Sequence, residues 1–280
     1  MRLAYTSADP EHVLTLRKEL LLRISHQWTC QEKFNQVLSR IDAINAGRAS
    51  HTSLVCMDLE FNSTTGRVYE VAICTLLPQE PEILINALTE RDVELPGHLN
   101  WENPLRNELV WFRQRSRVES NARAGRVLTS TRIMEILKTF LTPDTLILTW
   151  HQNTRDLRIL RQFLETNGHE TSAVLPPDHH CVPMIPQFRP NLGKLAPNKL
   201  FPAKLEILFT LLFPRNILSA QSHFALPDTL MLRLLVLAFL ELLKPIEQRD
   251  GMWQAIDHRI ESNQMLIEDY FDRCRTLIAL

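Results

Sequence analysis

The change of hydrophobic period near residue 53 is the feature that most constrains the fold of this chain. Three short apolar, β-rich runs follow one another there: SLVCMDLEF (53–61), GRVYEVAICTLL (66–77) and PEILINAL (81–88). Turn-forming residues separate them, such as the NSTTG stretch at 62–66 and Pro78. Short runs joined by tight turns are typical of antiparallel neighbours, so this region predicts a β-meander.

The order of elements then changes to alternating helices and strands. The pattern predicts a helix at 131–141, an apolar strand at 145–150 and a helix at 154–168, and this alternation requires crossover connections and parallel pairing. Residues 172–203 are rich in proline and predict a long loop with one short strand, CVPMI. We therefore predict an α/β fold with a mixed five-stranded sheet flanked by helices.

The sequence pattern predicts helices at both ends of the chain. Residues 9–46 contain two amphipathic segments, with Asp9 as a candidate N-cap, Pro10 at the first helical position and Gly47 at the end. Helical patterns return at 203–213, about 227–243 and 250–277. We expect a helical N-terminal extension (1–50) and a helical C-terminal extension (246–280), each packed on a central domain (51–245) because their apolar stripes need covering.

Composition excludes several classes of protein. The chain has 280 residues, 45% hydrophobic and 22% charged, and its 31 basic and 32 acidic side chains give a formal charge of -1. No global attraction to nucleic acid or membrane follows from that balance. Five scattered cysteines without C-x-x-C spacing, and no secretory leader, favour an intracellular protein of the cytoplasm or nucleus. The longest apolar run, 231–243, is too short to span a bilayer, so no membrane association is expected.

Two carboxylates lie one residue apart at the end of the first predicted strand. Side chains at i and i+2 project to the same face of a strand, so Asp58 and Glu60 crowd together unless a cation lies between them. Solvated acidic residues at a strand-to-turn junction are the alternative.

Further acidic residues occur at predicted helix starts. Asp156 falls in the first turn of the helix that follows the 145–150 strand, at the sheet edge where ligands bind in open α/β sheets. An aspartate there also stabilises a helix through its dipole, which is the alternative role. In SHFALPDTL, His223 precedes Asp228 at the mouth of an apolar helix, with Pro227 suited to its first position.

These motifs together resemble those of the DEDDh exonucleases of the RNase H-like superfamily, which includes proofreading subunits of DNA polymerases and RNA-trimming enzymes. The resemblance covers roughly 53–243. Asp58 and Glu60 fit the first motif, and Glu70 falls where the second strand of the family often carries a glutamate. A related branch uses a tyrosine four residues before the last aspartate, where this chain has Phe224.

The second and third motifs carry the rest of the resemblance. Asp156 fits the second motif, where His151 and Gln152 stand in the places of the usual His and Asn. His223 and Asp228 fit the third. The departures are Gln152 and the Leu-Pro pair before Asp228, and they bear on substrate fit.

The resemblance implies an RNase H-like fold and a 3'-to-5' exonuclease that hydrolyses phosphodiester bonds at single-stranded 3' ends, with RNA slightly favoured over DNA. Four carboxylates at one edge would need two Mg²⁺ or Mn²⁺ ions, roughly 3.5 to 4 Å apart. The implied metal ligands are Asp58, Glu60, Asp156 and Asp228. His223 is the implied general base. Leu59, Phe61 and Gln152 are implied substrate contacts.

Other features of the sequence leave alternatives open. The DHHCVP stretch at 178–183 lacks the second ligand pair of a zinc finger. The arginine-rich segment 113–126, near Trp101 and Trp111, and the basic segment 189–204 fit either phosphate binding or a solvated surface. The alternative function is a catalytically silent RNase H-like module that binds nucleic acid or a protein partner.

Overall fold

The computed structural model describes residues 10–62, 66–78, 80–89, 127–213, 216, 218 and 224–249. Its strands are β1 (Leu54–Phe61), β2 (Val68–Thr75), β3 (Ile83–Thr89), β4 (Val127–Leu128), β5 (Leu146–Thr149), β6 (Cys181–Pro183), β7 (Lys194–Ala196) and β8 (Lys199–Leu200). Its α-helices are α1 (Pro10–Ile24), α2 (Asn35–Asn45), α4 (Ser130–Phe140), α5 (Arg155–Thr166), α6 (Ile185–Leu192), α7 (Leu205–Leu212) and α8 (Ala225–Leu243). Short 3₁₀ turns lie at Glu32–Phe34, His51–Ser53, Asp178–His180 and Ile246–Gln248.

A mixed six-stranded sheet forms the centre of the fold, in the order β4-β3-β2-β1-β5-β6. Strands β1, β2 and β3 are antiparallel neighbours, whereas β5 is parallel to β1 and β6 is parallel to β5. The predicted meander and the predicted parallel pairing are both confirmed. Strand β1 is therefore central, with β2 on one side and β5 on the other.

The predicted count of five strands is wrong, because β4 adds a sixth strand parallel to β3. Val127 and Leu128 are its only residues, and they pair with Leu88 and Thr89. Two apolar residues after a long charged stretch show no period-two alternation, so the sequence carries no usable strand signal there.

The short strand predicted at CVPMI is confirmed as β6, but the long loop expected around it at 172–203 is wrong, since this region also contains helix α6 and the two-stranded sheet β7-β8. Pro186 lies in the first turn of α6, where a missing N–H costs no helical hydrogen bond. Pro190 lies inside the helix and removes one such bond. Phe188 and Leu192 are buried, so packing in the core stabilises this helix although its two prolines disfavour a helix.

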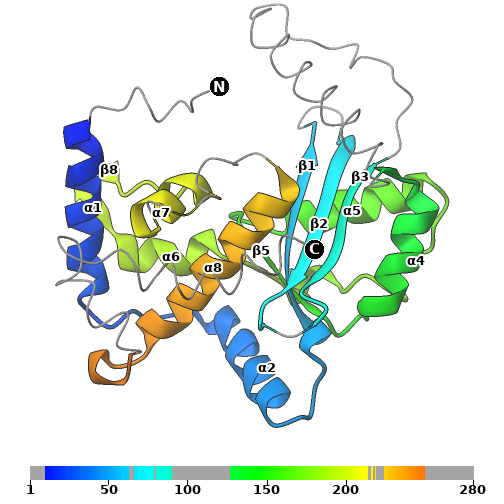
Figure 1. Ribbon diagram of the computed structural model, residues 1–280, viewed down its shortest axis with the longest axis horizontal. Coiled ribbons are helices and arrows are strands. Elements are labelled where there is room, and N and C mark those ends of the chain that lie inside the picture. The colour runs from blue at the N-terminus through cyan, green and yellow to red at the C-terminus, as the bar shows by residue number, and fades with distance from the viewer. Residues whose placement is uncertain are drawn as a thin grey trace, which may run out of the picture.

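Helices cover both faces of the sheet, and strand residues alternate between two core clusters. Leu54 and Cys56 of β1 join the cluster that also contains residues of α1, α6, α7 and α8. Val55 and Met57 join the cluster beneath α4 and α5. Figure 1 shows α8 crossing one face of the sheet and α4 and α5 on the other. The first four residues of β1 (54–57) are apolar on both faces for this reason.

Helix α1 and the segment that follows it pack on the α8 face. Leu20 and Trp28 are buried in the same cluster as Phe239 of α8. The Trp28 backbone N–H donates to the Leu242 carbonyl over 2.9 Å. The Arg249 guanidinium adds donations to carbonyl oxygens of two chain segments, namely Ile24 at 2.6 Å, His26 at 2.7 Å, Leu242 at 3.1 Å and Lys244 at 3.3 Å.

Most predicted helices are confirmed, including those at 131–141, 154–168, 203–213 and 227–243, with ends shifted by a few residues. Helix α8 starts at Ala225, so Pro227 is its third residue and not its first. The expected helix at 250–277 lies outside the described residues, and the domain boundaries at 50 and 245 stay predictions. None of the described helices combines the length and hydropathy that a bilayer crossing requires.

Arg249→Met should destabilise the protein, because it removes a charged donor from four carbonyl oxygens. We expect the free energy of unfolding in urea to fall by about 2 to 4 kcal/mol. Lys244→Met is the control, since the ion pair of Lys244 with Glu241 is partly exposed, and its loss should change stability by less than about 1 kcal/mol. Equal effects of the two variants would contradict the role given to Arg249.

Candidate metal site

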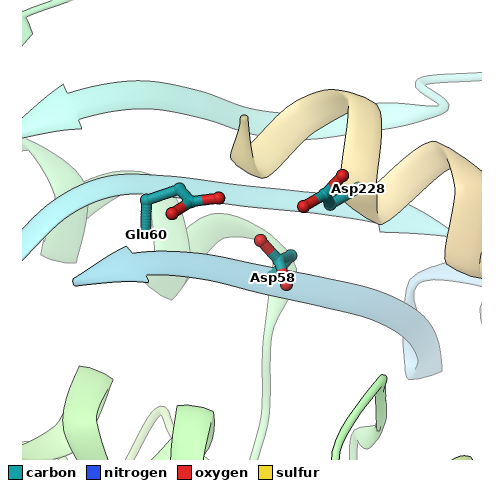
Figure 2. Close-up of side chains that lie close together, drawn as sticks. All are labelled: Asp58, Glu60 and Asp228. Atoms are coloured by element: carbon teal, nitrogen blue, oxygen red, sulfur yellow. The ribbon is translucent and has the colours of Figure 1, made fainter. Parts of the chain in front are cut away.

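Three carboxylates from two distant parts of the chain meet on the α8 face of the sheet. Asp58 and Glu60 come from β1, and Asp228 comes from the first turn of α8. One oxygen of each lies within 4.8 Å of the others, and all three residues are half-buried. Figure 2 shows the three side chains pointing toward one another between the strand and the helix. This spacing suits a single cation bound by hard oxygen ligands.

The pleat of β1 places Asp58 and Glu60 on this face. Asp58 lies opposite Ala72 of β2 in the antiparallel register, and Glu60 lies opposite Glu70. The next residue on the same face, Cys56, belongs to the core cluster under α8. Because side chains two residues apart share a face, the expectation that Asp58 and Glu60 project together is consistent with the observed cluster.

Glu70 holds the start of α8 against the sheet. The Ala225 backbone N–H donates to Glu70 Oε2 over 3.0 Å, and Glu70 is buried. Ala225 is the first residue of α8, and the first N–H groups of a helix have no acceptor within the helix. Glu70 therefore caps the helix and fixes the turn that carries Asp228.

Thr229, also buried, adds a second contact between this turn and the sheet. Its hydroxyl donates to the Ala225 carbonyl over 2.7 Å and lies 3.4 Å from the Ala72 carbonyl. The sequence motifs assigned no function to Glu70, so its capping role was missed. Its position opposite Glu60 is the feature that indicates this role, since two like charges that face each other across a strand pair need another partner.

Asp156 belongs to α5, a helix that packs on the face of the sheet opposite α8. It occupies the first turn of α5, as predicted, and is 4% exposed. It does not belong to the group of three whose oxygens lie within 4.8 Å of one another. Its charge nevertheless raises the pKa of Asp58. The structure thus brings together three of the four predicted ligands and sets the fourth within electrostatic reach.

Burial and mutual repulsion perturb the pKa values of these carboxyl groups. The pKa of Asp58 lies well above its usual range because of burial, and because Asp228, Asp156, Glu60 and Glu70 each raise it further. Burial raises the pKa of Asp156 to about 7, although the nearby Arg155 lowers it. Carboxyl groups that resist ionisation at neutral pH are stabilised in the charged form by a cation.

The other predicted site residues are His223, Leu59, Phe61 and Gln152. His223 falls outside the described residues. Leu59 is buried in the core cluster under α4 and α5, so its side chain belongs to the core. Phe61 is half-buried, with the Arg155 guanidinium 5.0 Å from the centre of its ring. Gln152 is exposed, and its backbone N–H donates to Nδ1 of His151 over 3.1 Å.

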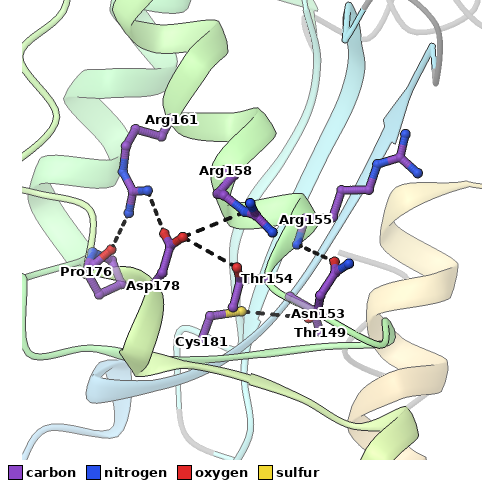
Figure 3. A network of polar contacts seen from close by, with 9 residues as sticks. All are labelled: Thr149, Asn153, Thr154, Arg155, Arg158, Arg161, Pro176, Asp178 and Cys181. Carbon is purple, nitrogen blue, oxygen red and sulfur yellow. Dashed lines mark hydrogen bonds and ion pairs between the residues drawn. The ribbon is translucent and has the colours of Figure 1, made fainter.

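The DHHCVP stretch takes part in an ion-pair network (Figure 3). Asp178 accepts from Arg161 at 2.6 Å and lies 3.7 Å from Arg158. His180 Nδ1 lies 2.9 Å from the Pro143 carbonyl. Within the part of the chain that the structure describes, the three carboxylates above are the one group arranged to hold a metal ion. The arginine-rich segment 113–126 lies outside the described residues.

Comparisons with protein-family models, with curated proteins and with solved structures gave no match for this chain. The candidate site therefore rests on its geometry alone. Two carboxylates lie on the central strand β1, a third lies on α8, whose start is capped by Glu70, and a fourth lies in the first turn of α5.

The metal-free protein should lose stability as pH rises from about 4 to 7. The pKa of Asp156 is higher in the folded state, so the folded state binds more protons in this range and the free energy of unfolding falls with pH. For Asp156 the loss approaches roughly 4 kcal/mol. Asp156→Asn should remove this part of the slope in urea titrations run with a chelator. An unchanged slope would contradict the perturbed pKa.

Mn²⁺ should stabilise the wild-type protein against heat at pH 7. A cation that binds only the folded state adds about 2.7 kcal/mol at a concentration 100-fold above its Kd. Asp228→Asn should abolish most of that gain, because it removes one of the three clustered ligands. Asp144→Asn is the control, since Asp144 is an exposed carboxylate in the turn before β5. Equal Mn²⁺ stabilisation of both variants would rule out this site.

Proposed function

We propose that the protein is a metal-dependent 3'-to-5' exonuclease that removes nucleotides from single-stranded 3' ends, with RNA slightly favoured over DNA. The observation that carries the proposal is the carboxylate cluster. Asp228 follows Glu60 by 168 residues in the sequence, yet one oxygen each of Asp58, Glu60 and Asp228 lie within 4.8 Å of one another. A strand-borne pair and a helix-borne aspartate are the arrangement that the sequence motifs predicted.

The donor set fits the proposed cations. Mg²⁺ and Mn²⁺ prefer oxygen ligands, and the clustered side chains offer carboxylate oxygens only. In the proposal Asp58, Glu60 and Asp228 would hold one ion, and Asp156 would help to hold a second. Bound ions of this kind supply an activated water and stabilise the oxygen that leaves phosphorus.

The side chains of the chain itself supply positioning and proton transfer. Glu70 keeps the Asp228 turn in place through its hydrogen bond to the Ala225 backbone. His223 precedes Asp228 by five residues and is proposed to accept the proton of the attacking water, since an ordinary histidine pKa near 6.5 leaves the ring largely neutral at pH 7.

His223→Ala and Asp58→Ala should both lose turnover, but only Asp58→Ala should also lose Mn²⁺ binding. Loss of a general base should lower turnover on single-stranded RNA by about 10²- to 10⁴-fold and leave Mn²⁺ and oligonucleotide affinity nearly intact. Loss of Asp58 should remove turnover and Mn²⁺ binding together, because Asp58 is one of the three clustered candidate ligands and would be shared by both proposed ions. Calorimetry with Mn²⁺ and a turnover assay on each variant test both statements.

The same assay separates the enzyme from a silent binding module. Wild-type protein given labelled single-stranded RNA and DNA with Mn²⁺ should release products from the 3' end, and a 3'-blocked oligonucleotide should resist. Binding without turnover would favour the silent module. If His223→Ala kept full turnover, or lost Mn²⁺ as completely as Asp58→Ala, the base would have to be another residue.

A further inference from the structure

A basic segment without acidic residues runs from the end of helix α6 to the start of helix α7. Residues 189–204 contain Arg189, Lys194, Lys199 and Lys204 and no aspartate or glutamate. Lys194 and Lys199 belong to the two-stranded sheet β7-β8, and Lys204 directly precedes α7. All three lysines are exposed, and together they form what we call the lysine surface.

The ammonium groups of the lysine surface are available to a ligand. Among the residues that the structure describes, none of these three side chains forms an ion pair or a hydrogen bond. Arg23 of α1, which lies next to them, pairs with Glu19 at 2.7 Å instead. The positive charge of the lysine surface is therefore not neutralised within the fold.

Helix α1 holds the base of the β7-β8 hairpin in place. Arg23 donates to the Leu192 carbonyl over 2.5 Å and to the Lys194 carbonyl over 2.9 Å, and its guanidinium lies 5.1 Å from the centre of the Phe201 ring. Leu192 and Phe201 are buried in the core cluster under α8. Because the backbone is fixed, only the lysine side chains lose freedom when a ligand binds.

A tryptophan joins the end of the basic segment to the sheet edge that carries the candidate site. Strand β5 is parallel to β1, with Leu148 beside Cys56. Trp150 and Asp58 each lie two residues beyond that pair, and Trp150 belongs to the core cluster on the α8 face. The indole N–H of Trp150 donates to the Ala203 carbonyl over 3.1 Å. The end of the basic segment is therefore held at the same edge and on the same face as Asp58.

Helix α7 continues this arrangement toward the carboxylate cluster. It begins directly after Lys204 and packs against both α1 and α8. Figure 1 shows α7 and β8 on the side of the sheet that α8 crosses. The lysine surface and the cluster that includes Asp228 thus share one face of the sheet.

Charge complementarity favours a polyanionic strand as the ligand of this surface. The chain as a whole has a formal charge of -1, so an anionic partner must be held by local positive charge. A nucleic acid strand carries one negative charge per phosphate, and the acidic cluster repels the part of the strand that no metal ion neutralises. Lysine ammonium groups are point charges that bind phosphates without a fixed geometry, which suits a backbone of any sequence.

We propose that the lysine surface binds the phosphate backbone of the single-stranded nucleic acid whose 3' end lies at the carboxylate cluster. The inference rests on the proposed function and deepens it, because it names the surface that holds the strand away from the reacting end. The three lysines bind the strand and take no part in metal binding or hydrolysis. A strand long enough to reach them should therefore bind more tightly than a short one.

Fluorescence anisotropy tests the proposal with 5'-labelled oligouridylates of about 4 and about 20 nucleotides, in Ca²⁺ and over a range of salt concentrations. The triple variant Lys194→Gln, Lys199→Gln, Lys204→Gln should bind the long oligouridylate roughly 10- to 100-fold more weakly. The slope of log affinity against log salt should shrink by about 2, since each phosphate of a single strand contributes about 0.7. The short oligouridylate should lose less affinity, because fewer of its phosphates reach the lysines.

A control variant with the same change in net charge separates this surface from general electrostatics. The triple variant Arg48→Gln, Arg132→Gln, Lys138→Gln removes exposed basic side chains from α4 and from the turn after α2, and it should bind both oligouridylates like the wild type. Both triple variants should keep the wild-type thermal midpoint and nearly the wild-type Mn²⁺ affinity by calorimetry, because all six side chains are exposed. Polyglutamate, an anionic chain without phosphates, serves as a competitor of the long oligouridylate and should displace it poorly.

Three results would overturn the inference while the proposed function stands. Equal affinity and salt slope of the two triple variants would show that the lysine surface has no part in strand binding. A loss of thermal stability in the lysine variant as strong as its loss of affinity would make the lysines structural. Displacement by polyglutamate as effective as by unlabelled oligouridylate would make an acidic protein the partner.

Failure of the proposed function gives a different result. A wild-type protein that bound the long oligouridylate through the lysines and did not cleave it in Mn²⁺ would contradict the exonuclease and support the lysine surface. A wild-type protein that neither bound nor cleaved the oligouridylate would contradict both.

Discussion

The packing of α8 across β1 and β2 is the contact on which both the core and the candidate site depend. Leu232 and Leu235 of α8 are fully buried in the core cluster that contains Leu54, Cys56 and Cys74 of these strands, and burial of each such leucine stabilises by about 1.5 to 3 kcal/mol. Arg233, on the same helix, donates to the Leu76 carbonyl over 3.0 Å and pairs with Glu82 at 3.0 Å. Apolar burial and this anchored arginine, acting together, hold Asp228 beside two residues of like charge.

The carboxylate cluster is electrostatically unfavourable, and packing in the rest of the fold holds it in place. Repulsion among carboxylates opposes the approach of α8 to β1, and it appears in the raised pKa of Asp58. The Glu70 cap acts in the opposite direction, because a carboxylate at a helix start satisfies a backbone donor and interacts favourably with the helix dipole. One acidic residue thus stabilises the turn that brings another into the cluster. Such conflicts in an otherwise consistent fold are typical of functional sites.

Much of this arrangement was predictable because it depends on local period. The alternation in β1 predicts that Asp58 and Glu60 share a face, and the helix start predicts that Asp228 lies at one end of α8. Helix α6 was missed because its prolines argue against a helix, whereas burial of Phe188 decides in its favour. The stack of Arg155 on its ring joins two elements that no sequence pattern pairs.

The location of the site also decides how variants can be interpreted. The carboxylates lie toward the end of β1 and in the first turns of α5 and α8, whereas the largest fully buried side chains are apolar, such as Phe34, Phe188 and Phe239. Removing one charge from the cluster relieves repulsion and leaves that core intact, so a neutral substitution there should keep the fold. A loss of metal binding or turnover in such a variant therefore reports on the chemistry of the site. The Glu70 cap is the exception, because removing it leaves a buried N–H without its acceptor and shifts the helix start as well.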